Sequence, residues 1–162
     1  MHKNVSLLNT FFLKFFLFFC IIMFAFYVSV NWYQVLLIHG ESMSPTYQDM
    51  QIVILEKHLE RYTYGDVIAF QCENLDSILV KRIVACPGDD VVIKNGHLYV
   101  NGTISVIFPQ ENVFEYAGII ETPLKLERNQ YFVLGDNIAE SKDSRYENIG
   151  CIEEENILGR VK

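Results

Sequence analysis

Two residue types in this sequence are suited to act together in nucleophilic catalysis: a serine in a turn and a lysine in an apolar strand. Ser42 lies in the stretch IHGESMSPTYQDM, where Gly40 and Pro45 predict a tight, exposed turn. Lys81 lies in SILVKRIVACPGD, an apolar run typical of a strand. A lysine whose pKa falls from about 10.4 to about 7–8 on burial accepts a proton from a serine hydroxyl. A Ser–Lys pair then performs the work of a Ser–His–Asp triad.

Each of these features also has a purely structural interpretation. Ser42 alone is compatible with an ordinary turn residue. Because strand side chains alternate between faces, Lys81 and Arg82 place one cation on each face, and both are compatible with edge positions whose charges reach water. The segment GDNIAESKDSRY, residues 135–146, is rich in turn formers and predicts a loop, in which an ion pair between Asp143 and Arg145 is conceivable.

The remaining reactive residue types give weaker signals. None of the histidines after the apolar segment lies in a recognisable catalytic frame; they are His39, His58 and His97. The cysteines outside that segment are an odd number at wide spacings, and they are Cys72, Cys86 and Cys151. This pattern predicts free thiols, with one pair left open, and no zinc site.

The N-terminal part of the chain predicts a membrane anchor. Residues 15–38 contain no Asp, Glu, Lys or Arg. At about 1.5 Å per residue, a helix of this length crosses a hydrocarbon core of about 30 Å. A cleaved signal peptide is the competing interpretation, but this run exceeds the usual apolar core of such peptides and no small-x-small cleavage site follows it. We therefore expect an uncleaved single span.

The charge distribution predicts the orientation of this anchor. Lys3 and Lys14 precede the apolar run, and the first acidic residue of the chain is Glu41. The positive-inside rule then places residues 1–14 in the cytoplasm and residues 39–162 outside the cell membrane. All 20 acidic residues lie in this outer domain, together with all but two of the 13 Lys and Arg. Its negative charge makes nucleic acid an unfavourable partner.

Residues 39–162 predict a mostly β domain. Short β-rich runs alternate with Gly, Asn, Asp and Pro turn signals. Asn95-Gly96, between VVIK and HLYV, is the strongest hairpin signal in the chain. Residues 105–128 show no sharp periodicity, and we interpret them as loops or a variable insertion. The expected fold is a single β domain that follows one transmembrane helix.

The motifs in their order resemble the type I signal peptidase family of bacteria. An apolar span is followed by GxSMxPT around Ser42, xKRxxxxPGD around Lys81, GDNxxxSxDSR and ILGR. The resemblance covers about residues 15–161 and is weakest over 104–128. It implies that Ser42 is the nucleophile and Lys81 the general base. Lysine at this position also distinguishes the bacterial type from the enzymes of the endoplasmic reticulum, which resemble it but have histidine there.

The resemblance implies further roles. Ser141 corresponds to a hydroxyl that orients the lysine, Asp143 and Arg145 to a supporting ion pair, and Met43 to a residue that lines the substrate pocket. The implied substrates are secretory preproteins, cut after small-x-small sequences such as Ala-x-Ala through an acyl-enzyme, without metal or cofactor. Some relatives supply a serine hydroxyl to the oxyanion hole from the position two residues before the nucleophile. Here that position is Gly40, so this side-chain donor is absent, an arrangement that resembles the family's Gram-positive members. The backbone N–H of Ser42 is then an expected donor.

Three alternatives remain open on the sequence. A signal-peptidase-like helper of pilus assembly has the same fold but lacks the catalytic residues, whereas Ser42 and Lys81 are both present here. A peptidase dedicated to one substrate is compatible with every motif. A membrane-anchored β module without activity is the third alternative, which holds if each of the motifs has only its structural interpretation. The expected partners are secretory preproteins and the lipid bilayer.

Overall fold

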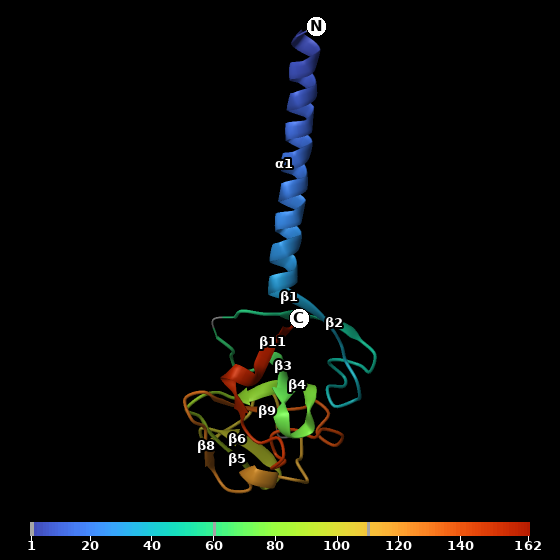
Figure 1. Cartoon of the computed structure of the whole chain (residues 1–162). Helices are drawn as coiled ribbons and strands as arrows, with labels where there is room; N and C mark the ends of the chain where they lie inside the picture. Colours follow the sequence, from blue (N-terminus) through green and yellow to red (C-terminus); the bar gives the residue numbers. More distant parts are fainter. Residues whose placement is uncertain (1, 60, 110) are drawn as a thin grey trace. The chain divides into compact units, whose positions relative to one another are not determined.

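The computed structural model describes residues 2–59, 61–109 and 111–162, with side chains from Phe11 onward. The chain divides into two compact units, Met1–Gln34 and Val35–Lys162. Figure 1 shows the first as one continuous helix and the second as a unit built of strands and loops. The expectation of a mostly β domain with one N-terminal apolar helix is confirmed.

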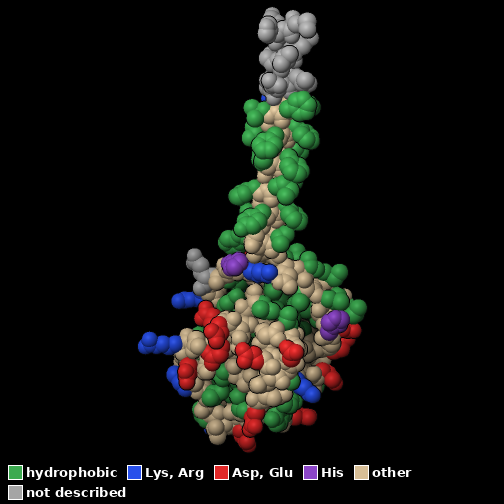
Figure 2. All heavy atoms as spheres, viewed as in Figure 1, with side chains coloured by type: hydrophobic (Ala, Val, Ile, Leu, Met, Phe, Trp, Pro, Cys, Tyr) green, Lys and Arg blue, Asp and Glu red, His purple; other side chains and the backbone are tan. Residues whose placement is uncertain are grey.

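The N-terminal unit is helix α1, His2–Trp32. Its segment Phe11–Trp32 has a mean hydropathy of 2.5, and none of that window is buried inside the protein. It is the one helix in the described part of the chain that is long and apolar enough to cross a membrane. Figure 2 shows hydrophobic side chains along its described length, as expected of a helix that contacts lipid tails.

The helix ends before the boundary expected from the sequence. Residues 15–38 are uniformly uncharged, but Tyr33–Leu37 forms strand β1. Ile38 is only 4% exposed and belongs to a core cluster. Its N–H donates to the Gln51 carbonyl, and its carbonyl accepts from the Met50 N–H, at 2.8 and 2.9 Å. Burial of Ile38 and these hydrogen bonds draw the last apolar residues into the β unit, so the expected end of the helix at Ile38 was wrong.

The larger sheet of the β unit contains seven strands in the order β1-β2-β11-β3-β4-β9-β10. Its further strands are β2 Ile52–Glu56, β11 Ile157–Val161, β3 Val67–Cys72, β4 Ser77–Ala85, β9 Gln130–Leu134 and β10 Ile152–Glu153. β4 pairs antiparallel with β3 on one side and with β9 on the other. Strand β4 is therefore an interior strand, and Lys81 and Arg82 do not lie on a sheet edge.

The smaller sheet has four strands in the order β7-β6-β5-β8. They are β5 Asp90–Lys94, β6 His97–Val100, β7 Thr103–Ile104 and β8 Leu124–Lys125. Lys94 pairs with His97, so Asn95 and Gly96 form the two-residue turn, and both have positive φ, at 52° and 77°. The hairpin expected at Asn95-Gly96 is confirmed, because this turn type requires left-handed residues.

Residues 105–109 and 111–128 pack onto the core without regular structure over most of their length. They contain a short 3-10 helix, Gly118–Ile120, and strand β8. Phe108, Phe114, Ile120 and Leu126 are each less than 5% exposed and join one core cluster with residues of β4, β5 and β9. These single apolar anchors recur every six residues, a spacing that matches neither the period of a strand nor that of a helix, so the sequence gave no helix or strand signal here.

Candidate active site

Lys81 lies in the middle of β4, opposite Ile68 of β3. Lys81 is only 4% exposed, which is unusual for a lysine. The Nζ atom is 2.7 Å from Ser42 Oγ and 3.0 Å from the Val80 carbonyl oxygen. The structure thus brings together two residues that are 39 positions apart in the chain, at a distance suited to proton transfer.

The surroundings of Lys81 lower the pKa of its amine. Burial is the largest effect and brings the pKa from 10.5 to about 8, while the negative charges of Asp143 and Asp136 oppose the fall. The cause is desolvation, which disfavours the ammonium form. Near neutral pH an appreciable fraction of Lys81 is then neutral, with a lone pair available to a hydroxyl proton.

The turn that carries Ser42 is held by its own hydrogen bonds. Gly40 has a φ of 86°, in the left-handed region that favours glycine, and its N–H donates to Asp49 Oδ1 at 2.8 Å. The Ser44 N–H donates to the Glu41 carbonyl at 3.1 Å. These contacts leave Ser42 half-buried, with its hydroxyl directed at Lys81.

The buried side chain of Met43 anchors this turn to the core of the β unit. It is 1% exposed and packs in a core cluster with Ile38, Val53 and Leu55. Its side chain therefore fixes the position of the neighbouring Ser42. The resemblance assigned Met43 to the substrate pocket, and at this burial a direct contact with substrate remains a prediction.

The loop after β9 closes over the serine turn. The Asn137 N–H donates to the Ser42 carbonyl at 3.1 Å, and Asn137 Nδ2 donates to the Glu41 carbonyl at 3.2 Å. Gly135 lies at the closest approach of the two segments. A Cβ at this position would stand 2.4 Å from the Ser42 carbonyl oxygen and 2.2 Å from Ser141 Oγ. Only glycine allows this approach without displacement of one segment.

A network of hydrogen bonds around the ion pair of Arg82 and Asp136, called the clamp below, also holds the site together. The sequence gave these residues no role in the site. Arg82 Nε donates to Asp136 Oδ1 at 2.7 Å, and Nη2 of the same guanidinium donates to Oδ2. Thr46, from the serine turn, also donates to Asp136 Oδ2, while Arg82 Nη1 donates to the Gly65 carbonyl at 2.8 Å. This network ties the serine turn, β4 and the loop after β9 together beside Lys81.

Each partner of this clamp has a purely local interpretation in the sequence. In the sequence, Arg82 is compatible with an edge position, and Asp136 lies in a segment that predicts only a loop. Their partnership spans 54 residues. Nothing in the local pattern of either segment indicates it.

Asp143 and Arg145 form a buried ion pair. Arg145 Nε is 2.8 Å from Asp143 Oδ1, with side-chain exposures of 3% and 0%. Arg145 Nη2 also donates to Asp143 Oδ2 at 3.0 Å and to the carbonyls of Ile138 and Ser141, and Asp143 Oδ2 accepts from the Gly135 N–H at 3.1 Å. The fork of Arg145 thereby sets the course of the loop from 135 to 145.

Ser141 reaches the site, but its hydroxyl has no hydrogen-bond partner among the described residues. It is 2% exposed and lies against Gly135, next to the serine turn. The hydrogen bond to Lys81 implied by the resemblance is therefore absent from this structure. Ser141 is poised beside the pair, and its role in orienting the lysine remains a prediction.

The backbone of Ser42 offers a donor for a developing oxyanion. Among the described residues, no hydrogen bond engages its N–H. Gly40 has no side chain to supply a second donor, and the space where its Cβ would lie is open.

All four cysteines are free thiols. The described residues contain no cluster of His, Cys, Asp and Glu suited to a metal ion.

Comparison with known proteins identifies the family. Residues 10–162 match the family described as signal peptidase, peptidase S26. The chain is 33% identical over 133 residues to signal peptidase I P of Bacillus subtilis subsp. natto, covering 75% of this chain and 70% of that protein. It is 32% identical over 136 residues to signal peptidase I T of Bacillus subtilis strain 168, covering 78% and 70% respectively.

A solved structure agrees with this match. The crystal structure of a signal peptidase I from Enterococcus faecalis V583 superposes with a TM-score of 0.52 at 26% identity, covering 65% of this chain and all of that one. The family match spans both the serine turn and the lysine strand. The chain belongs to the signal peptidase family, peptidase S26.

Proposed function

We propose that this protein removes signal peptides from secretory preproteins with Ser42 as nucleophile and Lys81 as general base. Membership of the family makes the chain a type I signal peptidase, a serine endopeptidase. The observation that carries the assignment of roles is the 2.7 Å separation of Lys81 Nζ and Ser42 Oγ. The burial that lowers the lysine pKa to about 8 adds to it.

The geometry supports the following acylation step. In the neutral form of Lys81, the Ser42 hydroxyl donates its proton to Nζ as Oγ attacks the scissile carbonyl carbon. The carbonyl oxygen becomes an oxyanion and accepts a hydrogen bond from the Ser42 N–H. When the C–N bond breaks, the Lys81 ammonium returns the proton to the leaving amine. The signal peptide is then held as an ester on Ser42.

Deacylation uses the same lysine. Lys81, again neutral, takes a proton from a water molecule that attacks the ester carbonyl, and then protonates Ser42 Oγ as it leaves. The charges of Asp143 and Asp136 keep the lysine pKa from falling further. A pKa near the working pH suits a group that must both accept and donate a proton.

The substrate and the location follow the same proposal. A preprotein segment binds extended, and shallow pockets admit only small side chains, which gives cleavage after sequences of the Ala-x-Ala type. The apolar part of α1 anchors the enzyme in the cell membrane, with residues 1–14 cytoplasmic and the β unit outside. Secretory preproteins and the bilayer are the partners.

Two alanine substitutions test these roles. Purified protein in detergent should cleave a preprotein that carries an Ala-x-Ala site, and Ser42→Ala and Lys81→Ala should each abolish cleavage. Ser44→Ala and Lys142→Ala are matched controls, since the first removes the other serine of the turn and the second an exposed lysine. Full cleavage by the Lys81→Ala protein would refute the proposed base. Cleavage of several unrelated preproteins would exclude a dedicated peptidase.

A further inference from the structure

The backbone donor for the oxyanion belongs to a peptide unit that is held from its other end. The N–H of Ser42 and the carbonyl of Glu41 are two ends of one planar, trans peptide unit, so they point in opposite directions. Among the described residues, no hydrogen bond engages this N–H. The carbonyl accepts two, one from the Ser44 N–H at 3.1 Å and one from Asn137 Nδ2 at 3.2 Å. Whatever holds the carbonyl therefore also aims the donor.

Asn137 also holds the peptide unit on the other side of Ser42. Its backbone N–H donates to the Ser42 carbonyl at 3.1 Å. One residue thus engages the carbonyls of two consecutive peptide units, the first with its side-chain amide and the second with its main chain. Two planar units held in this way leave little freedom to the φ and ψ angles between them. Asn137 therefore restricts the direction of the Ser42 N–H relative to the side chain of the same serine.

Asn137 is itself held in place by its neighbours. It is half-buried and directly follows Asp136, whose carboxylate is paired with Arg82 of β4. The Glu140 N–H donates to the Asn137 carbonyl at 3.2 Å and closes a turn. Because a carbonyl oxygen only accepts, the amide nitrogen of Asn137, and not its oxygen, must face Glu41. The side chain is thus presented to the serine turn in one orientation.

A hydrogen bond at the carbonyl end of a peptide unit acts on its N–H end in two ways. It fixes the orientation of the unit, and it polarises the unit so that the N–H becomes a stronger donor. Both effects matter most when negative charge develops on the substrate carbonyl oxygen, because donors already in place need no reorganisation at that moment. They therefore stabilise the transition state more than they stabilise the bound substrate.

We propose that Asn137 is a positioning residue for the oxyanion hole, which orients and polarises the Ser42 N–H through the Glu41 carbonyl. This inference rests on the proposed function, since it needs Ser42 as the nucleophile. Removal of an oxyanion donor typically lowers kcat about 100-fold or more. Here the donor itself remains, and the bond from Ser44 still holds the Glu41 carbonyl. Loss of the Asn137 amide should therefore lower kcat about tenfold.

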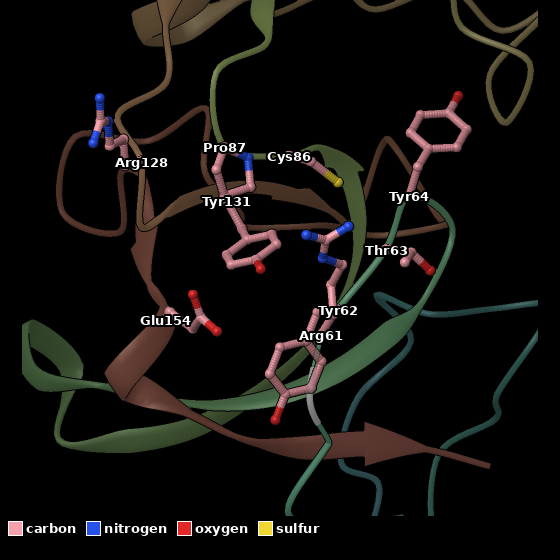
Figure 3. Close-up of a pocket in the computed structure, with 9 residues that line it drawn as sticks. All are labelled: Arg61, Tyr62, Thr63, Tyr64, Cys86, Pro87, Arg128, Tyr131 and Glu154. Atoms are coloured by element: carbon pink, nitrogen blue, oxygen red, sulfur yellow. The ribbon is translucent and has the colours of Figure 1, made fainter.

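Two control positions lie away from the serine turn. Asn74 is exposed, and its Nδ2 donates to the Asn148 carbonyl at 3.2 Å, the same contact outside the site. Arg128 lies at the margin of a cavity of about 550 Å³, which is drawn in Figure 3 and also lined by Tyr131. Tyr131 is near the start of β9 and Gly135 follows its end, so at about 3.3 Å per residue they are about 13 Å apart. Replacement of Arg128 by glutamine lowers the net charge by one, as does replacement of an asparagine by aspartate.

Steady-state cleavage of an Ala-x-Ala preprotein by the full chain in detergent tests the inference. Asn137→Ala should lower kcat about tenfold and leave KM within about twofold, because it removes no contact with the bound substrate. Asn137→Asp keeps the shape of the side chain but sets a carboxylate oxygen against the Glu41 carbonyl, so kcat should fall at least as far. Asn74→Ala and the charge-matched Arg128→Gln should both keep the wild-type kcat.

An inhibitor that forms an oxyanion separates positioning from a general loss of structure. When a peptidyl trifluoromethyl ketone with an Ala-x-Ala sequence binds, Ser42 Oγ bonds to the ketone carbon, the carbonyl π pair moves onto oxygen, and the hydroxyl proton passes to Lys81 Nζ. The matching trifluoromethyl carbinol binds without this step. Asn137→Ala should raise the inhibition constant of the ketone about tenfold and leave that of the carbinol unchanged.

The outcomes separate this inference from the proposed function. Equal kcat in Asn137→Ala and Asn74→Ala, or an equal rise in both inhibition constants, would overturn the role of Asn137 while the roles of Ser42 and Lys81 stand. A near-ultraviolet circular dichroism spectrum of Asn137→Ala and Asn137→Asp that differs from the wild type would assign Asn137 to folding, with the same consequence. Absence of cleavage by the wild-type protein would refute the proposed function and this inference with it.

Discussion

Replacement of Lys81 by methionine should make the protein more stable near neutral pH while it abolishes catalysis. Lys81 is 4% exposed in the interior of a sheet, and its amine is mostly charged below the pKa of about 8. A buried ammonium without a carboxylate in direct contact is costly, and methionine has similar length without charge. The lysine therefore opposes folding at the pH where the enzyme works.

The magnitude follows from the pKa. Its fall from 10.5 to about 8 on folding, at about 1.4 kcal/mol per pKa unit, corresponds to about 3 kcal/mol. Because the folded state releases the proton first, the unfolded state binds more protons between pH 8 and 10.5. The stability of the wild type consequently rises with pH in this window and lacks this contribution below it. The Lys81→Met protein should lack that rise.

Denaturant unfolding of both proteins in detergent, followed by the near-ultraviolet circular dichroism of the β unit, measures the effect. The difference in free energy of unfolding between them should change by about 3 kcal/mol from neutral pH to about pH 10.5. The hydrogen bonds lost to Ser42 and Val80 cost about 1 kcal/mol each and reduce the gain at neutral pH. Other titrating groups cancel in the comparison. A difference that is constant with pH would show that Lys81 is not desolvated as described.

Three substitutions around the pair test how it is positioned. Gly135→Ala places a Cβ 2.4 Å from the Ser42 carbonyl oxygen. The resulting shift of roughly 1 Å should lower kcat/KM about 100-fold, whereas Gly102→Ala, which meets nothing within 4 Å, should leave kcat/KM unchanged. Asp136→Asn should lower kcat/KM about tenfold through loss of its pair with Arg82; an equal loss in Asp90→Asn, whose ion pair is exposed, would argue against a specific clamp. Asp143→Ala should reduce the free energy of unfolding by about 3–5 kcal/mol, because it leaves a buried guanidinium without its carboxylate; an unchanged melting temperature would contradict this.

Most of the site was predictable from the sequence because its motifs are local. Ser42, Lys81, Asp143 and Arg145 each lie in a short segment with its own turn or strand signal, and the structure brings these segments together. The Asn95-Gly96 hairpin was predictable for the same reason, since two adjacent residues determine the turn.

The rest depended on contacts between distant segments. The pairing of Arg82 with Asp136 spans 54 residues, and neither local pattern reveals it. The end of α1 was misplaced because an apolar residue is equally compatible with lipid and with a protein core, and Ile38 occupies the core. Residues 105–128 escaped prediction because isolated anchors such as Phe114 follow neither the period of a strand nor that of a helix.

The central claim is that neutral Lys81 takes the proton of Ser42. The pH dependence of kcat/KM for cleavage of an Ala-x-Ala preprotein tests it most directly, because this quantity reports the ionisation of groups in the free enzyme. Activity should rise as the ammonium loses its proton, with an acidic limb of unit slope and a midpoint at the lysine pKa of about 8. A profile that is flat from about pH 6 to about pH 10, or that rises only near the unperturbed value of about 10.4, would contradict it.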